Sequence, residues 1–213
     1  MAALVVVDLG GTLLRGATVC EVLAARLGRV EEMKRFESLT GQAETAAARS
    51  EMARWYTEIS RESLIECLSG AQWAPGAIQG VYRLREAGVY VGIASITWGF
   101  AVDWFAAQLG VEHVLATELG ENGHIEHAWP EDKPAWMERL ALRLQVQSEN
   151  VAAVGDSFGD VAMLQAASLP FYVGSHPPPG TRFLHRPAAN VLTLAQECGA
   201  RCSGQSLRDA RRR

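Results

Sequence analysis

Four short stretches of the chain are apolar without alternation between polar and apolar positions. They cover residues 4–8, 89–95, 151–156 and, less strongly, 169–173. Uninterrupted runs of Val, Ile and Ala of this length are typical of strands that are covered on both faces, as in parallel sheets. The pattern therefore predicts a sheet that is packed between two layers of helices.

Helical patterns separate these strands. One begins at Pro75-Gly76 and runs to about residue 87, before Gly88, and a second covers residues 100–109, before Gly110. Two more cover residues 132–146 and 160–167. Alternation of strands and helices predicts an α/β fold: a doubly wound, mostly parallel, Rossmann-like sheet with right-handed crossovers.

Two segments interrupt the alternation. Residues 17–72 carry only helical signals, which predicts an all-helical cap inserted after the first strand. Residues 116–129 read as a small hairpin that turns at Glu121-Asn122-Gly123. We therefore expect an α/β core made of residues 1–16 and 73–200, a cap made of residues 17–72, and a basic tail without fixed structure at residues 201–213.

Composition and charge narrow the function classes. The chain of 213 residues has a formal net charge of −4, which argues against nucleic acid as a partner. It has no apolar stretch long enough to span a membrane, and its N-terminus lacks the features of a signal peptide. The four scattered cysteines read as reduced thiols. We expect a cytoplasmic protein without a membrane partner, either a monomer or a homodimer.

Polar side chains stand where the predicted strands end. Asp8, Ser95 and Asp156 each follow an apolar run, and parallel strands bring their carboxyl ends to one edge of the sheet. Carboxylates that converge there repel one another unless a cation lies between them, and their oxygen atoms suit Mg²⁺. Asp160, four residues after Asp156, could bind the same ion or orient its water ligands. A carboxylate beside such an ion can attack phosphorus.

Phosphoryl transfer also requires hydrogen-bond donors and a positive charge. Ser95 offers a hydroxyl together with nearby backbone N–H groups, and Lys133, at the start of a predicted helix, offers an ammonium group. Taken alone, Lys133 reads as a solvated surface lysine and Asp156 as a helix N-cap. The ordered set of four groups gives the prediction its weight.

This ordered set resembles the haloacid dehalogenase-like superfamily, and within it the phosphoserine phosphatase-like branch, over about residues 4–195. The motifs are Asp-Leu-Gly-Gly-Thr at residues 8–12, then Ser95, Lys133, and Gly-Asp-Ser-Phe-Gly-Asp at residues 155–160. The resemblance implies a Mg²⁺-dependent hydrolase of small phosphorylated metabolites that passes through an aspartyl-phosphate intermediate.

The resemblance also implies roles for individual residues. Asp8 would be the nucleophile and a metal ligand, and Ser95 and Lys133 would assist catalysis while holding the phosphoryl group. Thr12 and Ile96 would contribute to substrate binding. The metal site would be formed by Asp8, Asp156, Asp160 and the backbone carbonyl of Gly10.

Gly10 departs from the pattern, because phosphatases of this superfamily carry a second aspartate there. That aspartate protonates the leaving oxygen and then activates water, a contribution of roughly 10²- to 10⁴-fold in rate. A cap carboxylate could replace it, a good leaving group could make it dispensable, the protein could be a degenerate binding or regulatory relative, or residue 10 could be a sequence error. The candidate cap carboxylates are Glu21, Glu37, Glu44, Glu51, Glu58 and Glu62.

Two further comparisons bear on the reaction and the substrate. Phosphonatase-like members keep the metal site and add a cap lysine, and Lys34 is the only lysine in the predicted cap. Phosphoserine phosphatases carry a cap glutamate where this chain has Ala17, and two glycines where Ile96 and Thr97 follow Ser95. The resemblance therefore extends to phosphate ester hydrolysis but does not assign phosphoserine as the substrate.

Overall fold

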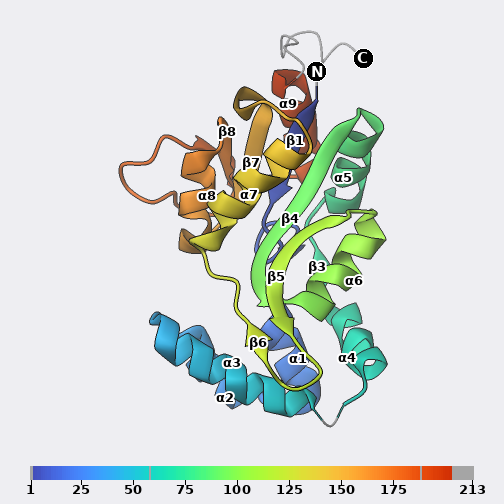
Figure 1. Ribbon diagram of the computed structural model, residues 1–213, viewed down its shortest axis with the longest axis vertical. Coiled ribbons are helices and arrows are strands. Elements are labelled where there is room, and N and C mark those ends of the chain that lie inside the picture. Colours follow the sequence, from blue (N-terminus) through green and yellow to red (C-terminus); the bar gives the residue numbers. More distant parts are fainter. Residues whose placement is uncertain (1, 58, 188, 203–213) are drawn as a thin grey trace.

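A seven-stranded sheet runs through the centre of the protein in the order β6-β5-β4-β1-β7-β8-β9 (Figure 1). The computed structural model describes residues 2–57, 59–187 and 189–202. Every neighbouring pair of strands in this sheet is parallel except β5 and β6, which form the predicted hairpin. The strands are β1 Ala3–Val7, β4 Val89–Trp98, β5 His113–Leu119, β6 Ile125–Glu126, β7 Val151–Gly155, β8 Leu169–Tyr172 and β9 Leu184–His185.

Helices cover both faces of the sheet, which confirms the predicted doubly wound α/β class. Three of them, α5 (Ala77–Glu86), α6 (Gly99–Leu109) and α9 (Val191–Cys202), share one apolar core. The other face packs against α7 (Asp132–Arg143) and α8 (Val161–Ala166) through a second core. Alternate residues of β1 enter the two cores, because successive side chains of a strand point to opposite faces. All five residues of β1 are therefore buried.

The register of the central strands sets up one polar edge. Val7 of β1 pairs with Ile93 of β4 on one side and with Val154 of β7 on the other. The side chains that follow these three residues are thus carried to the same end of the sheet. The residues predicted for the site all come from this end, from α7, or from the turn that follows β7.

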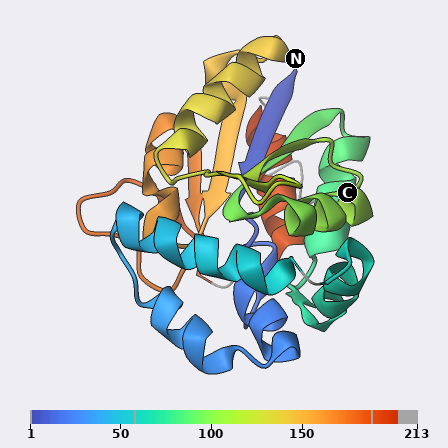
Figure 2. The ribbon, with the colours of Figure 1, turned by 60° about the horizontal axis from the view of Figure 1, so that its bottom comes forward.

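In the described residues, four α-helices form the insertion after β1, called the cap, and Figure 2 shows them beyond the carboxyl ends of the central strands. Both of its connections to the core pass through a two-stranded antiparallel ribbon, in which Leu14 pairs with Trp73 and Arg15 with Gln72. The cap helices are α1 Val19–Leu27, α2 Val30–Glu37, α3 Gln42–Tyr56 and α4 Arg61–Cys67, and the ribbon strands are β2 Leu14–Arg15 and β3 Gln72–Trp73. The prediction that residues 17–72 contain no strand is wrong at Gln72.

The sequence pattern missed several peripheral elements. The strand β5 begins at His113, ahead of the predicted hairpin segment, and pairs with β4 in parallel. The short strand β9 and the helix α9 were not predicted, and α9 includes residues 201 and 202 of the expected tail. Residues 203–213 of that tail lie outside the described residues. Among the helices that the structure describes, none is long and apolar enough to cross a membrane.

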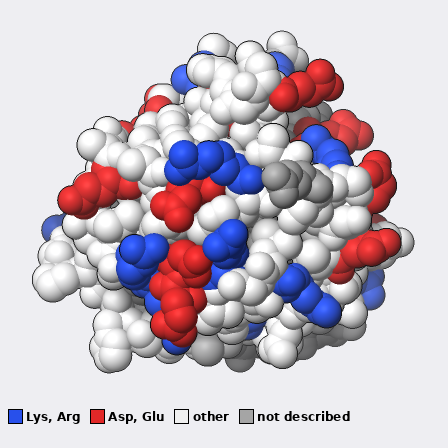
Figure 3. Space-filling view, turned by 90° about the horizontal axis from the view of Figure 1, so that it is seen from below, with Lys and Arg blue, Asp and Glu red and all other residues white. Residues whose placement is uncertain are grey.

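Charges of both signs are interspersed on the cap end of the molecule (Figure 3). Residues three positions apart in α2 and at its N-cap form ion pairs, between Arg29 and Glu32 at 3.0 Å and between Lys34 and Glu31 at 2.7 Å. These side chains are largely exposed, so each pair contributes little to stability. The mixture of signs gives this face no extended field of one charge.

Phe105 gives a direct test of the larger core. Its side chain is 1% exposed and meets the rings of Trp73 and Trp104 edge-on, with centroids 5.3 and 4.8 Å away. We expect Phe105→Ala to lower the free energy of unfolding by about 3–5 kcal/mol in urea denaturation, because it removes buried area and leaves a cavity. The same change at Phe158, which is 85% exposed, should alter it by less than about 0.5 kcal/mol. Equal losses for the two variants would contradict this description of the core.

Candidate active site

Asp8 is the first residue after β1, at the polar end of the sheet. Its backbone N–H donates to the carbonyl oxygen of Val154 at 2.9 Å, which extends the pairing of β1 and β7 by one more bond. The strand therefore fixes the backbone of Asp8 up to the point where its carboxylate leaves the sheet. The residue is only 7% exposed, so this carboxylate needs partners within the protein.

Lys133 supplies the positive partner. It lies in the first turn of α7 and is 2% exposed. Its Nζ atom lies 2.8 Å from Oδ1 of Asp8 and 2.6 Å from Oδ1 of Asp160. The surface-lysine reading of Lys133 is therefore wrong. Because both ion pairs are buried, removing either partner would leave an uncompensated charge in the interior.

Asp160 is held by the turn that follows β7. Its Oδ2 atom accepts the backbone N–H groups of Asp156 and Ser157, each at 3.1 Å, and the Ser157 hydroxyl at 2.9 Å. Asp156 in turn accepts a hydrogen bond from the Thr12 hydroxyl at 2.9 Å. One carboxylate oxygen from each of Asp8, Asp156 and Asp160 falls within a cluster whose atoms all lie within 4.8 Å of one another.

The cluster carries more negative than positive charge. Burial and the neighbouring Asp160 raise the pKa of Asp8 to about 7, although Lys133 acts in the opposite direction. Burial also raises the pKa of Asp156, against the hydrogen bond from Thr12. Burial alone would lower the pKa of Lys133, but Asp8 and Asp160 together raise it above its ordinary value. One ammonium group thus does not satisfy three carboxylates.

The carboxylate cluster fits a divalent cation. Converging carboxylate oxygens are the donor set that Mg²⁺ and Ca²⁺ prefer. The chain also leaves room for the acids to approach: a Cβ atom at Gly11, whose φ is +76°, would lie 2.1 Å from Oδ2 of Asp156. A Cβ atom at Gly155 would lie 2.4 Å from Cβ of Asp160. The two glycines are required for this close packing of acids.

The sequence profile of haloacid dehalogenase-like hydrolases matches residues 5–165, which include the whole carboxylate cluster and Lys133. The chain belongs to the haloacid dehalogenase-like hydrolase family. A curated phosphoserine phosphatase from Archaeoglobus fulgidus is 27% identical over 175 residues, which are 78% of this chain and 51% of that protein. The chain thus spans about half the length of this relative.

Solved structures show the same fold. A substrate-bound phosphoserine phosphatase superposes with a TM-score of 0.77 at 18% identity, over 92% of this chain and 98% of that one. A phospho-aspartyl intermediate analogue of phosphoserine phosphatase gives a TM-score of 0.75 with the same identity and coverage. The chain therefore has the same overall fold as these two solved structures.

The other residues predicted for the site, Ser95, Thr12 and Ile96, have different kinds of partners in the structure. Ser95 is buried next to the cluster end of β4, and its Oγ atom accepts the Thr97 N–H at 3.4 Å. The side chain of Thr12, predicted to bind substrate, instead donates to Asp156 and so orients an acid of the cluster. Ile96 presents its carbonyl oxygen to Arg49 and Thr117, each at 2.9 Å. That carbonyl faces the cap and β5.

Gly10 has open space around it. A Cβ atom built there would meet nothing within 4 Å, and the residue does not have a positive φ. The backbone therefore admits a side chain at this position. The absence of an aspartate at residue 10 is thus not imposed by the fold.

Two of the cap carboxylates proposed to compensate for Gly10 have other partners in the structure. Glu21 forms a capping box with Thr18, whose N–H it accepts at 2.6 Å. Glu37 accepts the Thr18 hydroxyl at 3.0 Å. Lys34 pairs with Glu31 on the surface, which gives no support to a phosphonatase-like reaction. Glu58 lies outside the described residues, and in the part of the chain that the structure describes no hydrogen bond or ion pair joins Glu44, Glu51 or Glu62 to the carboxylate cluster.

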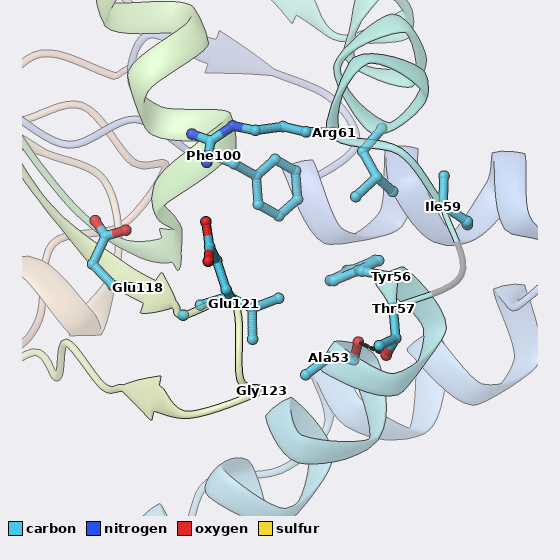
Figure 4. A pocket seen from close by; sticks show the side chains of 12 residues that line it. Ala53, Tyr56, Thr57, Ile59, Arg61, Phe100, Glu118, Glu121 and Gly123 are labelled. Atoms are coloured by element: carbon cyan, nitrogen blue, oxygen red, sulfur yellow. Dashed lines mark hydrogen bonds between the residues drawn. The ribbon is translucent and has the colours of Figure 1, made fainter.

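A separate cavity of about 380 Å³ lies between the cap and the hairpin of β5 and β6 (Figure 4). Tyr56 and Phe100 form part of its apolar wall, while Arg61, Glu118 and Glu121 bring charges to it. No member of the carboxylate cluster lines it. This cavity is distinct from the site around Asp8.

Gly11 and Gly10 form a matched pair for testing the metal site. We expect Gly11→Ala to weaken Mg²⁺ binding at least tenfold, because the new Cβ atom would displace the Asp156 carboxylate and strain a left-handed backbone. Gly10→Ala, which meets no neighbour, should leave the affinity within about twofold. Isothermal titration calorimetry measures both. An unchanged affinity in Gly11→Ala would show that Asp156 does not bind the ion.

The pKa of Asp8 predicts a pH dependence of stability in the metal-free protein. The folded state keeps a proton on Asp8 up to about pH 7, whereas an unfolded chain releases it near the ordinary value of 3.8. Between these values the folded state binds more protons, so the free energy of unfolding should fall as the pH rises toward 7. Denaturation in EDTA at several pH values should show this decrease, and Asp8→Asn should lack that part of it. Identical pH profiles for the two proteins would contradict the shifted pKa.

Proposed function

We propose that the protein is a Mg²⁺-dependent phosphomonoester hydrolase of small phosphorylated metabolites, with Asp8 as its nucleophile. The observation that carries this proposal is the buried cluster in which Asp8 lies 2.8 Å from Lys133, beside Asp156 and Asp160. Membership of a hydrolase family supports the reaction class. The names of the similar proteins support phosphate esters as substrates.

The reaction would proceed in two displacements. A carboxylate oxygen of Asp8 attacks phosphorus, the bond from phosphorus to the ester oxygen breaks, and the alcohol leaves after gaining a proton. Water then attacks the phosphorus of the aspartyl phosphate, which releases inorganic phosphate and restores the carboxylate. A divalent cation at Asp8, Asp156 and the Gly10 carbonyl, supported by Asp160, would offset the negative charge of the phosphoryl oxygens.

Other groups of the chain would hold the phosphoryl group during both steps. Lys133 keeps Asp8 in place in the free protein and provides a fixed positive charge beside the reacting phosphorus. Ser95, buried within β4, provides a hydroxyl, whose Oγ atom accepts the N–H of Thr97. Donors fixed in advance stabilise the transition state without reorganising during the reaction.

Gly10 determines how fast such an enzyme works. Without a carboxyl group there, the leaving oxygen must be protonated by water or by another group, so esters of weakly acidic alcohols should react slowly. Esters with good leaving groups need less help. We therefore propose a slow phosphatase as it stands, and a binding or regulatory protein as the alternative that the same glycine favours.

The substrate is proposed only as a class. The curated relative is a phosphoserine phosphatase, yet this chain has an exposed Ala17 where that branch carries a glutamate. Glu21, one helical turn further on, is held by Thr18 in the capping box. Phosphoserine therefore belongs in the substrate panel without being the preferred candidate.

Phosphate release with Mg²⁺ tests the proposal directly. We expect slow hydrolysis of an activated aryl phosphate by the wild-type protein and no turnover by Asp8→Asn, since that variant lacks the nucleophile. Gly10→Asp, which has space around it, should accelerate alkyl phosphates by roughly 10²- to 10⁴-fold. The panel should include phosphoserine and other alkyl phosphates.

Two controls decide between the alternatives. Gly10→Ala fills the same space without a carboxyl group, so it should not accelerate alkyl ester hydrolysis. Circular dichroism and Mg²⁺ titration should show that each variant is folded and binds the ion. Absence of turnover in wild type and in Gly10→Asp, with folded protein and bound Mg²⁺, would reject the hydrolase and favour the binding protein.

A further inference from the structure

Arg49 is a buried charge outside the carboxylate cluster. It belongs to α3 of the cap, is 5% exposed, and directs its guanidinium group into the core. Its Nη2 atom donates to the Ile96 carbonyl oxygen at 2.9 Å, and Nη1 donates to the Ala128 carbonyl oxygen at 3.2 Å. Nη1 also lies 3.1 Å from Nδ1 of His127. A buried guanidinium requires such acceptors, and all three belong to the core.

Further contacts fasten α3 to the same part of the core. The guanidinium carbon of Arg49 lies 4.5 Å from the centre of the Trp129 ring, which stacks on His127 at 5.1 Å. At the start of α3, Gln42 donates to Glu131 at 2.6 Å. The core residues in these contacts belong to the segment that leads into α7. The cap helix α3 is therefore attached to the core only a few residues before Lys133 in the sequence.

The Ile96 carbonyl links this attachment to the active site. It accepts Arg49 from the cap and Thr117 from β5, each at 2.9 Å. Every described peptide bond is trans, and the carbonyl and N–H of a trans peptide point in opposite directions. Because Arg49 and Thr117 both donate to the carbonyl oxygen of Ile96, the N–H of Thr97 in the same peptide points away from them. That N–H faces Oγ of Ser95, at 3.4 Å.

We propose that Arg49 is a positioning residue that couples cap closure to phosphoryl binding through the peptide between Ile96 and Thr97. When the cap is closed, Arg49 fixes the Ile96 carbonyl, and the Thr97 N–H holds Oγ of Ser95, the hydroxyl that would contact a phosphoryl oxygen. When the cap opens, this peptide loses one of its two restraints and the donor loses its fixed direction. The inference rests on the proposed function, because it assigns a donor of that same site.

Variants of the two donors to Ile96 test the coupling. Arg49→Met removes all the hydrogen bonds of the guanidinium and keeps an apolar stem, and we expect kcat to fall about 10- to 100-fold, which corresponds to the loss of a charged hydrogen bond. Arg49→Lys should recover part of this, because a single ammonium cannot reproduce the planar fork. Thr117→Val should lower kcat about three- to tenfold.

The substrate used in the assay separates positioning from direct contact. An aryl phosphate without a carboxyl group, and inorganic phosphate as a competing ligand, should both be affected, because the Thr97 N–H acts on the phosphoryl group through the Ser95 hydroxyl. Arg61→Met, an exposed cap arginine paired with Asp103 at 3.5 Å, should change neither by more than twofold. An Arg49→Met effect confined to substrates that carry a carboxylate would show direct contact and overturn the proposal.

Amide hydrogen exchange tests the peptide itself and needs no turnover. We expect the Thr97 amide to exchange at least tenfold faster in Arg49→Met than in wild type, while amides of β1 and β7 keep their rates. Should the wild-type protein prove inactive, the proposed function would fail, and this measurement would still decide whether Arg49 positions the peptide. Unchanged exchange at Thr97 would overturn the coupling.

Discussion

The ammonium group of Lys133, buried between Asp8 and Asp160, is the interaction on which the rest of the site depends. It brings together a strand end, a helix start and a turn that lie far apart along the chain, at Nζ to oxygen distances of 2.8 and 2.6 Å. Because it does not balance the three acids, the cluster offers a set of carboxylate oxygens that suits a further cation. Glycines 11 and 155 follow from the same requirement, since any side chain at these positions would overlap an acid. The same requirement, close approach of the acids, thus determines both the chemistry of the site and the residues that pack around it.

The central part of the fold could be predicted because burial on both faces leaves a strong signal. The segments that form β1, β4, β7 and β8 are continuous and apolar. Each predicted strand begins within two residues of the observed start and ends within three residues of the observed end. The elements that were missed lie at the edges. The strand β9 has only two residues, and β5 carries polar residues on a partly exposed edge, so neither produces a continuous apolar run. Tertiary pairing, which the local pattern does not contain, determines them.

The site shows the same division. Residues at the ends of central strands could be predicted, because parallel strands bring their carboxyl ends together, and the structure places Asp8 and Asp156 in one cluster. The hydroxyl of Thr12 could have bonded to substrate or to an acid, and only the geometry shows that it meets Asp156. Arg49 was missed, because one arginine among several in a polar cap helix gives no signal until the helix is placed on the core. The open space at Gly10 is likewise a property of the folded chain.

The paired strands β2 and β3 have a consequence for how such a protein evolves. The chain leaves the core at Leu14 and returns at Trp73, and these two residues are hydrogen-bonded neighbours in one ribbon. The inserted segment therefore joins the core at the same two adjacent residues, whatever its length. A longer insertion raises the entropic cost of closing the loop only slowly. Substitutions, additions or whole replacements between β2 and β3 can therefore leave Asp8, Lys133 and Asp160 in their places. The inserted segment and the carboxylate cluster can change separately within one chain.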